Sequence, residues 1–84
     1  MATQSVTATF TGAQSLDGDF PYVDITWTSA YASVGVYRIF AGTAITDANG
    51  VIVVNLKSKT TTGVRVLASD QFTGSVELTA VDAP

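Results

Sequence analysis

The sequence predicts an all-β fold, either a small six-stranded antiparallel β-sandwich or a partly closed barrel. Its 84 residues are enough for one core, so we expect a single domain over residues 1–84. The β-branched residues Thr (13) and Val (11) are abundant, whereas Leu (4), Glu (1) and Met (1) are scarce. Apolar residues recur with a period of two in six short segments, which is the pattern of half-buried strands.

The first three expected strands lie in the N-terminal half of the chain. Residues 5–11 (SVTATFT) and 22–28 (YVDITWT) alternate cleanly between an apolar and a polar face. Residues 34–40 (VGVYRIF) form the third strand, with Val34, Val36 and Phe40 on one face and Tyr37 and Ile39 on the other. The turn LDGD at 16–19 and the small-residue loop at 29–33 separate these strands.

The other three expected strands are residues 51–57 (VIVVNLK), 64–69 (VRVLAS) and 75–82 (SVELTAVD). The loop at 41–50 precedes them and ends in Asn49-Gly50, a pair that favours positive φ. A Thr-rich turn occupies residues 58–63, and residues 70–74 are predicted to be the hairpin loop between the last two strands.

Several functions are excluded or disfavoured by composition. With no Cys and no His, the chain has no thiolate nucleophile, no ordinary imidazole base and no disulfide. Four Lys and Arg against seven Asp and Glu, net charge −3, disfavour nucleic acid and anionic membranes as partners. The N-terminus lacks the basic and apolar regions of a signal peptide, and the longest aliphatic run has four residues. We therefore expect no enzyme activity and no cofactor.

Carboxylate pairs offer only weak candidate sites. Asp17-x-Asp19 and Asp47-x-Asn49-Gly50 resemble fragments of a calcium loop, but neither has the bidentate Glu that such a loop requires. Asp24 with a neighbouring Asp could be imagined as a glycosidase pair, although nothing in the sequence fixes a separation. We interpret these residues as turn and strand-face residues, and predict no metal site and no catalytic residue.

An excess of apolar residues suggests a surface that is covered in an assembly. The chain is 46% hydrophobic and 13% charged, whereas soluble domains average about 25% charged residues. The excess falls on the second face of the strands at 34–40, 51–57 and 64–69. These strands could simply be central strands covered by loops, or the second face could be an oligomer or lattice interface. The predicted interface residues are Tyr37, Arg38, Ile39, Val51, Val53 and Leu67.

Loop aromatics are the second set of candidate contacts. Tyr31 and Phe72 lie in predicted loops, where an aromatic ring can stack on a sugar or anchor a protein partner. Gln71 beside Phe72 adds a group that can form hydrogen bonds. The alternative is that both rings fold back as lids on the ends of the sandwich.

The chain resembles small bacteriophage virion proteins. The resemblance is carried by residues 22–28 (YVDITWT) and 72–82 (FTGSVELTAVD), in a short, Cys-free, Thr/Val/Ala-rich chain. It implies a capsid decoration (cement) protein, or a head or tail fibre component, of a type that is commonly trimeric. The expected partners are further copies of the chain and the major coat or tail proteins, and the expected location is the virion.

A weaker similarity points to the H-type lectin domain, a six-stranded sandwich that trimerises. It is carried by Thr60-Thr61-Thr62-Gly63-Val64. The chain lacks the late Trp and the polar and charged cluster with which those lectins hold a sugar. The sequence therefore leaves three hypotheses open, which are a structural virion protein, a carbohydrate-binding module and, least favoured, an enzyme.

Overall fold

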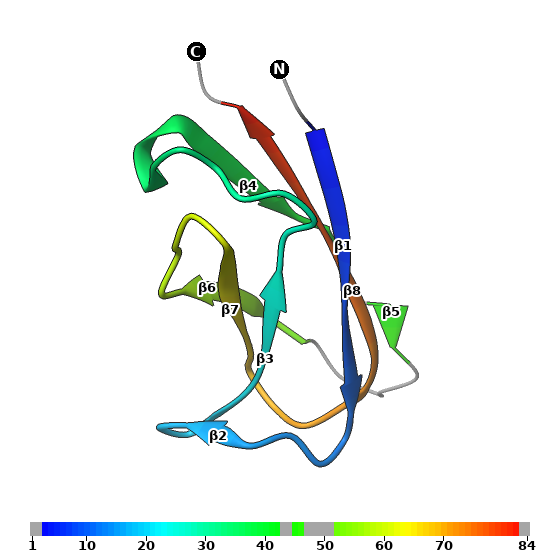
Figure 1. Ribbon diagram of the computed structural model, residues 1–84. Coiled ribbons are helices and arrows are strands. Elements are labelled where there is room, and N and C mark those ends of the chain that lie inside the picture. Colours follow the sequence, from blue (N-terminus) through cyan, green and yellow to red (C-terminus); the bar gives the residue numbers. More distant parts are fainter. Residues whose placement is uncertain (1–2, 43–44, 47–51, 83–84) are drawn as a thin grey trace.

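The protein is a sandwich of two antiparallel β-sheets, seen here in a computed structural model that describes residues 3–42, 45–46 and 52–82 (Figure 1). The first sheet contains β1 (Thr3–Thr11), β8 (Thr73–Asp82), β4 (Tyr37–Ala41) and β5 (Ile45–Thr46). The second sheet contains β2 (Leu16–Asp17), β3 (Phe20–Thr26), β7 (Gly63–Ala68) and β6 (Val54–Lys57). The sheets are separate, so the sandwich is the correct one of the two predicted architectures.

In the first sheet, the two ends of the chain lie side by side (Figure 1). β1 pairs with β8 along its whole length, from Thr3 opposite Val81 to Thr11 opposite Thr73. On its other side β8 pairs with β4 and, further along, with β5. Alternation places Ala8 and Phe10 in the core and leaves the threonines of β1 exposed, as the sequence predicts.

In the second sheet, β3 and β7 are the central strands. β2 and β3 form a hairpin whose turn contains Gly18 at φ 65°, a conformation that glycine adopts without strain. β6 and β7 form a second hairpin through the predicted Thr-rich turn. β2 and β6 are the edge strands of this sheet.

The core between the sheets is apolar and has an aromatic cluster at each end. Near the chain termini, Tyr31 stacks on Tyr37 with ring centroids 4.1 Å apart, and Trp27 meets the Tyr37 ring edge-on at 6.0 Å. At the opposite end Phe10 stacks on Phe72 at 4.7 Å. Smaller residues of β7 and β8 fill the middle: Val64, Val66, Ala68, Val76, Leu78 and Ala80.

The short strands β2 and β5 lie in the expected turn at 16–19 and the expected loop at 41–50, and the strand expected at 51–57 begins only at Val54. Two further details of the sequence prediction are wrong. Residues 34–36 form one 3₁₀ turn, so the strand expected at 34–40 begins only at Tyr37. Residues 70–74 are not a hairpin loop, because β7 and β8 belong to different sheets and the connection crosses the sandwich. Both errors arise because local alternation does not reveal which strands pair.

Within the described ranges, no helix is long and apolar enough to cross a membrane.

Candidate functional site

The most unusual surface feature of the protein is the number of large apolar side chains in contact with solvent. They lie in three places, the β2–β3 hairpin, the segment from the 3₁₀ turn into β4, and the β6 edge. Within the described residues these exposed side chains are Leu16, Phe20, Val34, Val36, Phe40, Val53 and Leu56. Phe40 is 60% exposed and Val53 is 53% exposed, so neither contributes fully to the core of the single chain.

A shallow groove connects two of these places. It has a volume of about 310 Å³ and lies between the start of β3 and the edge strand β6. Phe20, Val53, Leu56 and Leu67 give it an apolar lining, and Asn55, Lys57, Ala68 and Ser69 complete it. Ligand pockets of drug-sized molecules begin at about 300 Å³ and are more enclosed, so the groove suits one or two side chains of a partner.

The predicted interface residues do not form one surface. Val53 and Leu67 both line the groove. Tyr37 is only 1% exposed and Ile39 packs against the core, so both lie on the inner face of β4. The outer face carries Arg38 and the exposed Phe40 instead. Val51 lies outside the described residues.

The predicted loop contacts, Tyr31, Gln71 and Phe72, are not in the exposed positions that stacking on a sugar requires. Tyr31 and Phe72 are buried as lids on the two ends of the sandwich, which was the alternative for both rings. Gln71 is part-buried and bonds the backbone of Gln14 twice, accepting from its N–H at 3.0 Å and donating to its carbonyl at 2.9 Å. These three residues are therefore structural in the isolated chain.

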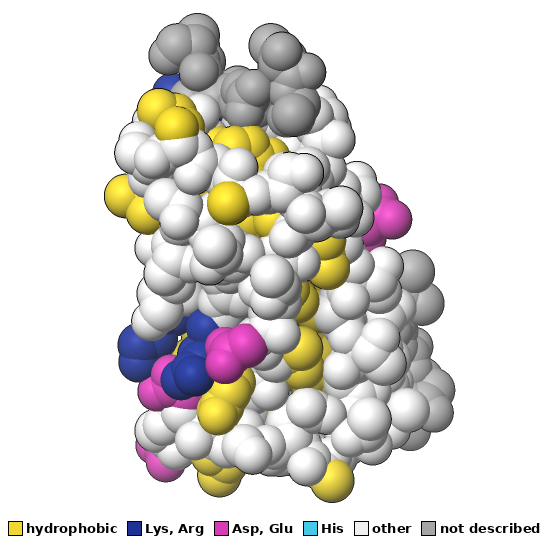
Figure 2. All heavy atoms as spheres, viewed as in Figure 1, with side chains coloured by type: hydrophobic (Ala, Val, Ile, Leu, Met, Phe, Trp, Pro, Cys, Tyr) yellow, Lys and Arg dark blue, Asp and Glu magenta, His cyan; other side chains and the backbone are white. Residues whose placement is uncertain are grey.

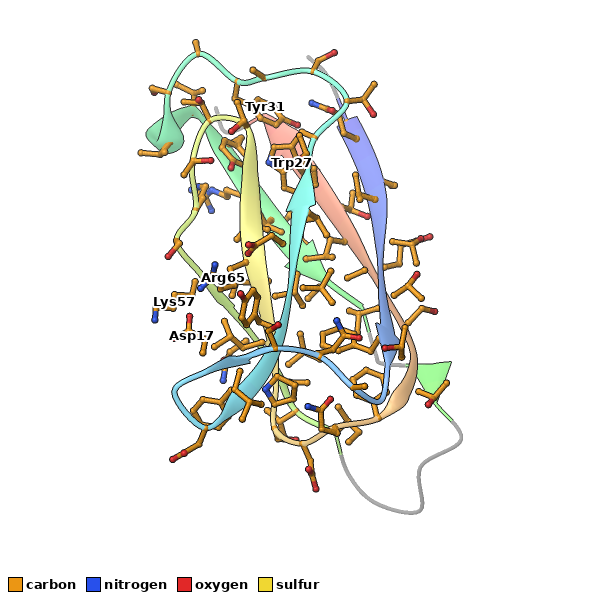
Figure 3. All side chains as sticks on the ribbon, turned by 60° about the horizontal axis from the view of Figure 1, so that its bottom comes forward. Asp17, Trp27, Tyr31, Lys57 and Arg65 are labelled. Atoms are coloured by element: carbon orange, nitrogen blue, oxygen red, sulfur yellow. The ribbon has the colours of Figure 1, made fainter. Side chains whose placement is uncertain are left out.

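Beside the groove, an ion-pair network covers the outer face of the second sheet (Figure 3). Asp17 bonds Lys57 at 3.0 Å and Arg65 at 2.9 Å, and Arg65 also makes a two-pronged contact with Asp24 at 2.8 and 3.1 Å. The Arg65 guanidinium lies 3.9 Å from the ring centroid of Tyr22, a cation–π contact.

This network has a clear electrostatic consequence. Hydrogen bonds from Lys57 and Arg65 hold the pKa of Asp17 below its ordinary value, and the hydrogen bonds from Arg65 do the same for the pKa of Asp24. The two carboxylates in turn raise the pKa of Arg65. In Figure 2 these side chains form one compact charged cluster on a surface that is otherwise mostly uncharged. The two positive and two negative charges of the cluster sum to zero.

Outside this cluster, the described surface offers few groups that could bind a metal or a polar ligand. Among the described residues, no three Asp or Glu side chains gather as metal ligands would. Asp17 of the first calcium-like fragment is engaged by Lys57 and Arg65, and the second fragment lies outside the described residues. A polar hollow of about 250 Å³ lies beside the β6–β7 turn, lined by hydroxyls such as Thr60 and Thr62 and by the already paired Asp24 and Arg65.

The sequence pattern could have located more of this surface than it did. Phe20 lies on the same face of β3 as Tyr22 and Asp24, and Phe40 lies on the same face of β4 as Arg38, so period two alone groups each of these rings with polar neighbours. Phe20 was missed because it precedes the expected strand, and Phe40 because the expected strand began three residues too early.

Comparison of the chain with protein-family models, with curated proteins and with solved structures finds no match in any of the three. The candidate site therefore has to be interpreted from its own chemistry.

Proposed function

We propose that the protein is a non-enzymatic structural subunit of a bacteriophage virion, which decorates the capsid by binding the coat lattice. The observation that carries the proposal is the set of large apolar side chains left exposed on a small, weakly charged sandwich. Exposed apolar patches of this kind mark surfaces that are covered in an assembly, because in water they promote aggregation. A location on the tail or in a fibre is the alternative within the same class.

The distribution of the apolar side chains supports more than one contact. Phe40 and the valines of the 3₁₀ turn lie on or beside the first sheet, whereas Phe20 and Val53 lie on the second. Two separated apolar regions suit a subunit that contacts both its own copies and the coat protein. The carbohydrate-binding alternative gains no support, because Tyr31 and Phe72 are buried.

The direct test is mass spectrometry of purified phage particles from the source whose genome encodes this chain. We expect its peptides in the particles at a constant ratio to the major coat protein, and in the head fraction after heads and tails are separated. Peptides in the tail fraction would favour the fibre alternative. Their absence from purified particles would contradict the proposal.

A binding test uses the purified protein and heads that lack it. The protein should co-sediment with such heads, and Phe40→Ser should weaken the binding if the outer face of β4 is a contact. The matched control is Thr9→Ser, an exposed change on β1 of the same sheet that leaves the apolar surface intact. Binding to a glycan array, without binding to heads, would instead support the carbohydrate-binding module.

A further inference from the structure

The edge strand β6 has a row of backbone groups directed away from its own sheet. Ser69 donates its N–H to the carbonyl of Val53 at 2.9 Å, so the backbone of Val53 is turned toward β7. Because this direction alternates along an antiparallel strand, Asn55 and Lys57 also turn toward β7, whereas Val54 and Leu56 turn outward. Among the described strands, only β7 pairs with β6.

Within the described residues, this edge lacks the protection that edge strands usually have. It contains no proline, and its single charge, Lys57, is held by Asp17. Leu56 is 36% exposed, and Val53, just before the strand, is more exposed still. The strand ends at Ser58, whose φ of 57° turns the chain away. An unprotected apolar edge of this kind is a template for a further strand.

We propose that the added strand is β6 of a second copy of this chain, antiparallel about a two-fold axis at Asn55. In this register Val54 lies opposite the partner's Leu56, and the outward backbone groups of both residues form the new hydrogen bonds. Asn55 lies opposite the partner's Asn55, so amide meets amide. Val53 lies opposite the partner's Lys57, whose aliphatic stem can cover the groove beside Val53 while its ammonium stays with Asp17.

The side chains select this register over its two neighbours. A shift in one direction would place Asn55 opposite the partner's Val53, which sets an amide against an apolar side chain. A shift in the other direction would pair Val54 with the partner's Ser58, where the strand conformation has already ended. Of these three registers, only the one centred on Asn55 sets amide against amide while pairing Val54 with Leu56, which is the self-complementarity that a two-fold interface requires.

The inference depends on the proposed function only in that both make the chain an assembly subunit. The shared strand is short, and interfaces below about 1,200 Å² are typical of weak complexes. We therefore expect a dimer that dissociates on dilution and is held more firmly when the copies are concentrated on a lattice.

The test uses the absence of cysteine from the chain. Asn55→Cys would introduce a single thiol on the two-fold axis. Directly opposite residues of a non-hydrogen-bonded antiparallel pair have Cα atoms about 4.5 Å apart, which is within the range of disulfides. Under mild oxidation we expect about tenfold or more covalent dimer from Asn55→Cys than from the control Thr9→Cys, an exposed thiol on the other sheet.

Mixing variants tests the register. Val53→Cys mixed with Lys57→Cys should form a heterodimeric disulfide more readily than either variant forms a homodimer. If Asn55→Cys and Thr9→Cys cross-link equally, or if neither does, the inference is wrong.

A second measurement needs no substitution. Amide hydrogen exchange of the unaltered protein should slow at Val54 and Leu56 as protein concentration rises, while Asn55 and Lys57 stay unchanged. Unprotected Val54 and Leu56 amides at every concentration would overturn the inference even if a cysteine variant failed to fold. If particles contain the Asn55→Cys protein but it does not cross-link there, only the edge pairing is contradicted. If the purified protein forms the dimer but is absent from particles, only the virion role is contradicted.

Discussion

Two stacked tyrosines at one end of the core differ in how their hydroxyl groups are satisfied. The Tyr37 hydroxyl accepts a hydrogen bond from the indole N–H of Trp27 at 3.2 Å and donates to the carbonyl of Thr60. The Tyr31 hydroxyl is buried without a hydrogen-bond partner among the described residues. Sequence alone could not show this difference, since it places Tyr31 in a loop and Tyr37 in a strand but does not reveal which polar groups lie near their hydroxyls.

This difference predicts opposite results for the same substitution. Tyr37→Phe should lower the free energy of unfolding by about 1–3 kcal/mol, because the buried indole N–H loses its acceptor. Tyr31→Phe should leave stability unchanged or raise it, since the lost hydroxyl has no described partner. Urea denaturation of the two variants measures this, and a larger loss for Tyr31→Phe would contradict the hydrogen-bond assignment.

The ion-pair network predicts how stability depends on pH. The pKa values of Asp17 and Asp24 are lower in the folded chain than their ordinary value of 3.8, so the folded state binds fewer protons there. Their contribution to stability is therefore complete above that value and is lost as pH falls below it, through the lowered pKa values. The urea midpoint should drop between about pH 5 and pH 2.

The double variant Asp17→Asn, Asp24→Asn is the control for this pH effect. It should be less stable at neutral pH and should lose less stability on acidification than the unaltered chain. An equally steep acid decline in both proteins would show that these two carboxylates are not the cause.

At the scale of elements, β4 shows how a small error in a strand boundary changes the interpretation of a surface. The sequence pattern grouped Phe40 with Val34 and Val36, and placed Tyr37 and Ile39 on a surface for assembly. In the structure the valines lie in the 3₁₀ turn, Ile39 packs against the core, and Phe40 points outward. The register with β8, Ile39 opposite Ala80 and Phe40 opposite Thr79, fixes this orientation.

A pair of aspartate substitutions tests this orientation. Ile39→Asp should cost more than about 2 kcal/mol of stability, because it places a charge against the core. Phe40→Asp should cost about 1 kcal/mol or less, the range that β-propensity spans, because the side chain faces solvent. Thermal unfolding of dilute protein measures both, and equal losses would contradict the face assignment.

The pairing of β3 with β7 depends on a glycine. At Gly63 a Cβ atom would overlap the backbone carbonyl of Ile25 on the neighbouring strand. Gly63→Ala should therefore lower stability by about 3 kcal/mol or more, since the strands have to separate. Gly35→Ala is the matched control, because a Cβ there meets nothing within 4 Å, and we expect a change within about 0.5 kcal/mol. Similar unfolding midpoints for both variants would contradict the close strand approach.

At the scale of the whole molecule, the first sheet is formed by strands that are far apart in the sequence. β8 lies between β1 and β4, so the last strand completes the first sheet, and Tyr37 and Lys59 link the two sheets near the chain termini. The first sheet therefore cannot form before the whole chain is present.

This topology predicts slow folding for so short a chain. Because the pairing of β1 with β8 joins the two ends of the sequence, we expect refolding in milliseconds to seconds, the range of β-sandwiches, and not in microseconds. Stopped-flow fluorescence of Trp27 measures this rate. Refolding within microseconds would imply that local contacts dominate the transition state.

The sequence by itself determined the fold class, most strand positions and the clean alternation of β1, β3 and β8, because period two is a local property of an extended chain. It also placed Val53 and Leu67 on a common apolar face, and both residues line the groove. Tertiary structure alone decided that Tyr31, Tyr37 and Phe72 close the core, that β7 and β8 lie in different sheets, and that β6 is an edge. The physical reason is that alternation divides each strand into two faces, whereas only long-range pairing decides which face is buried and which strand lies beside it.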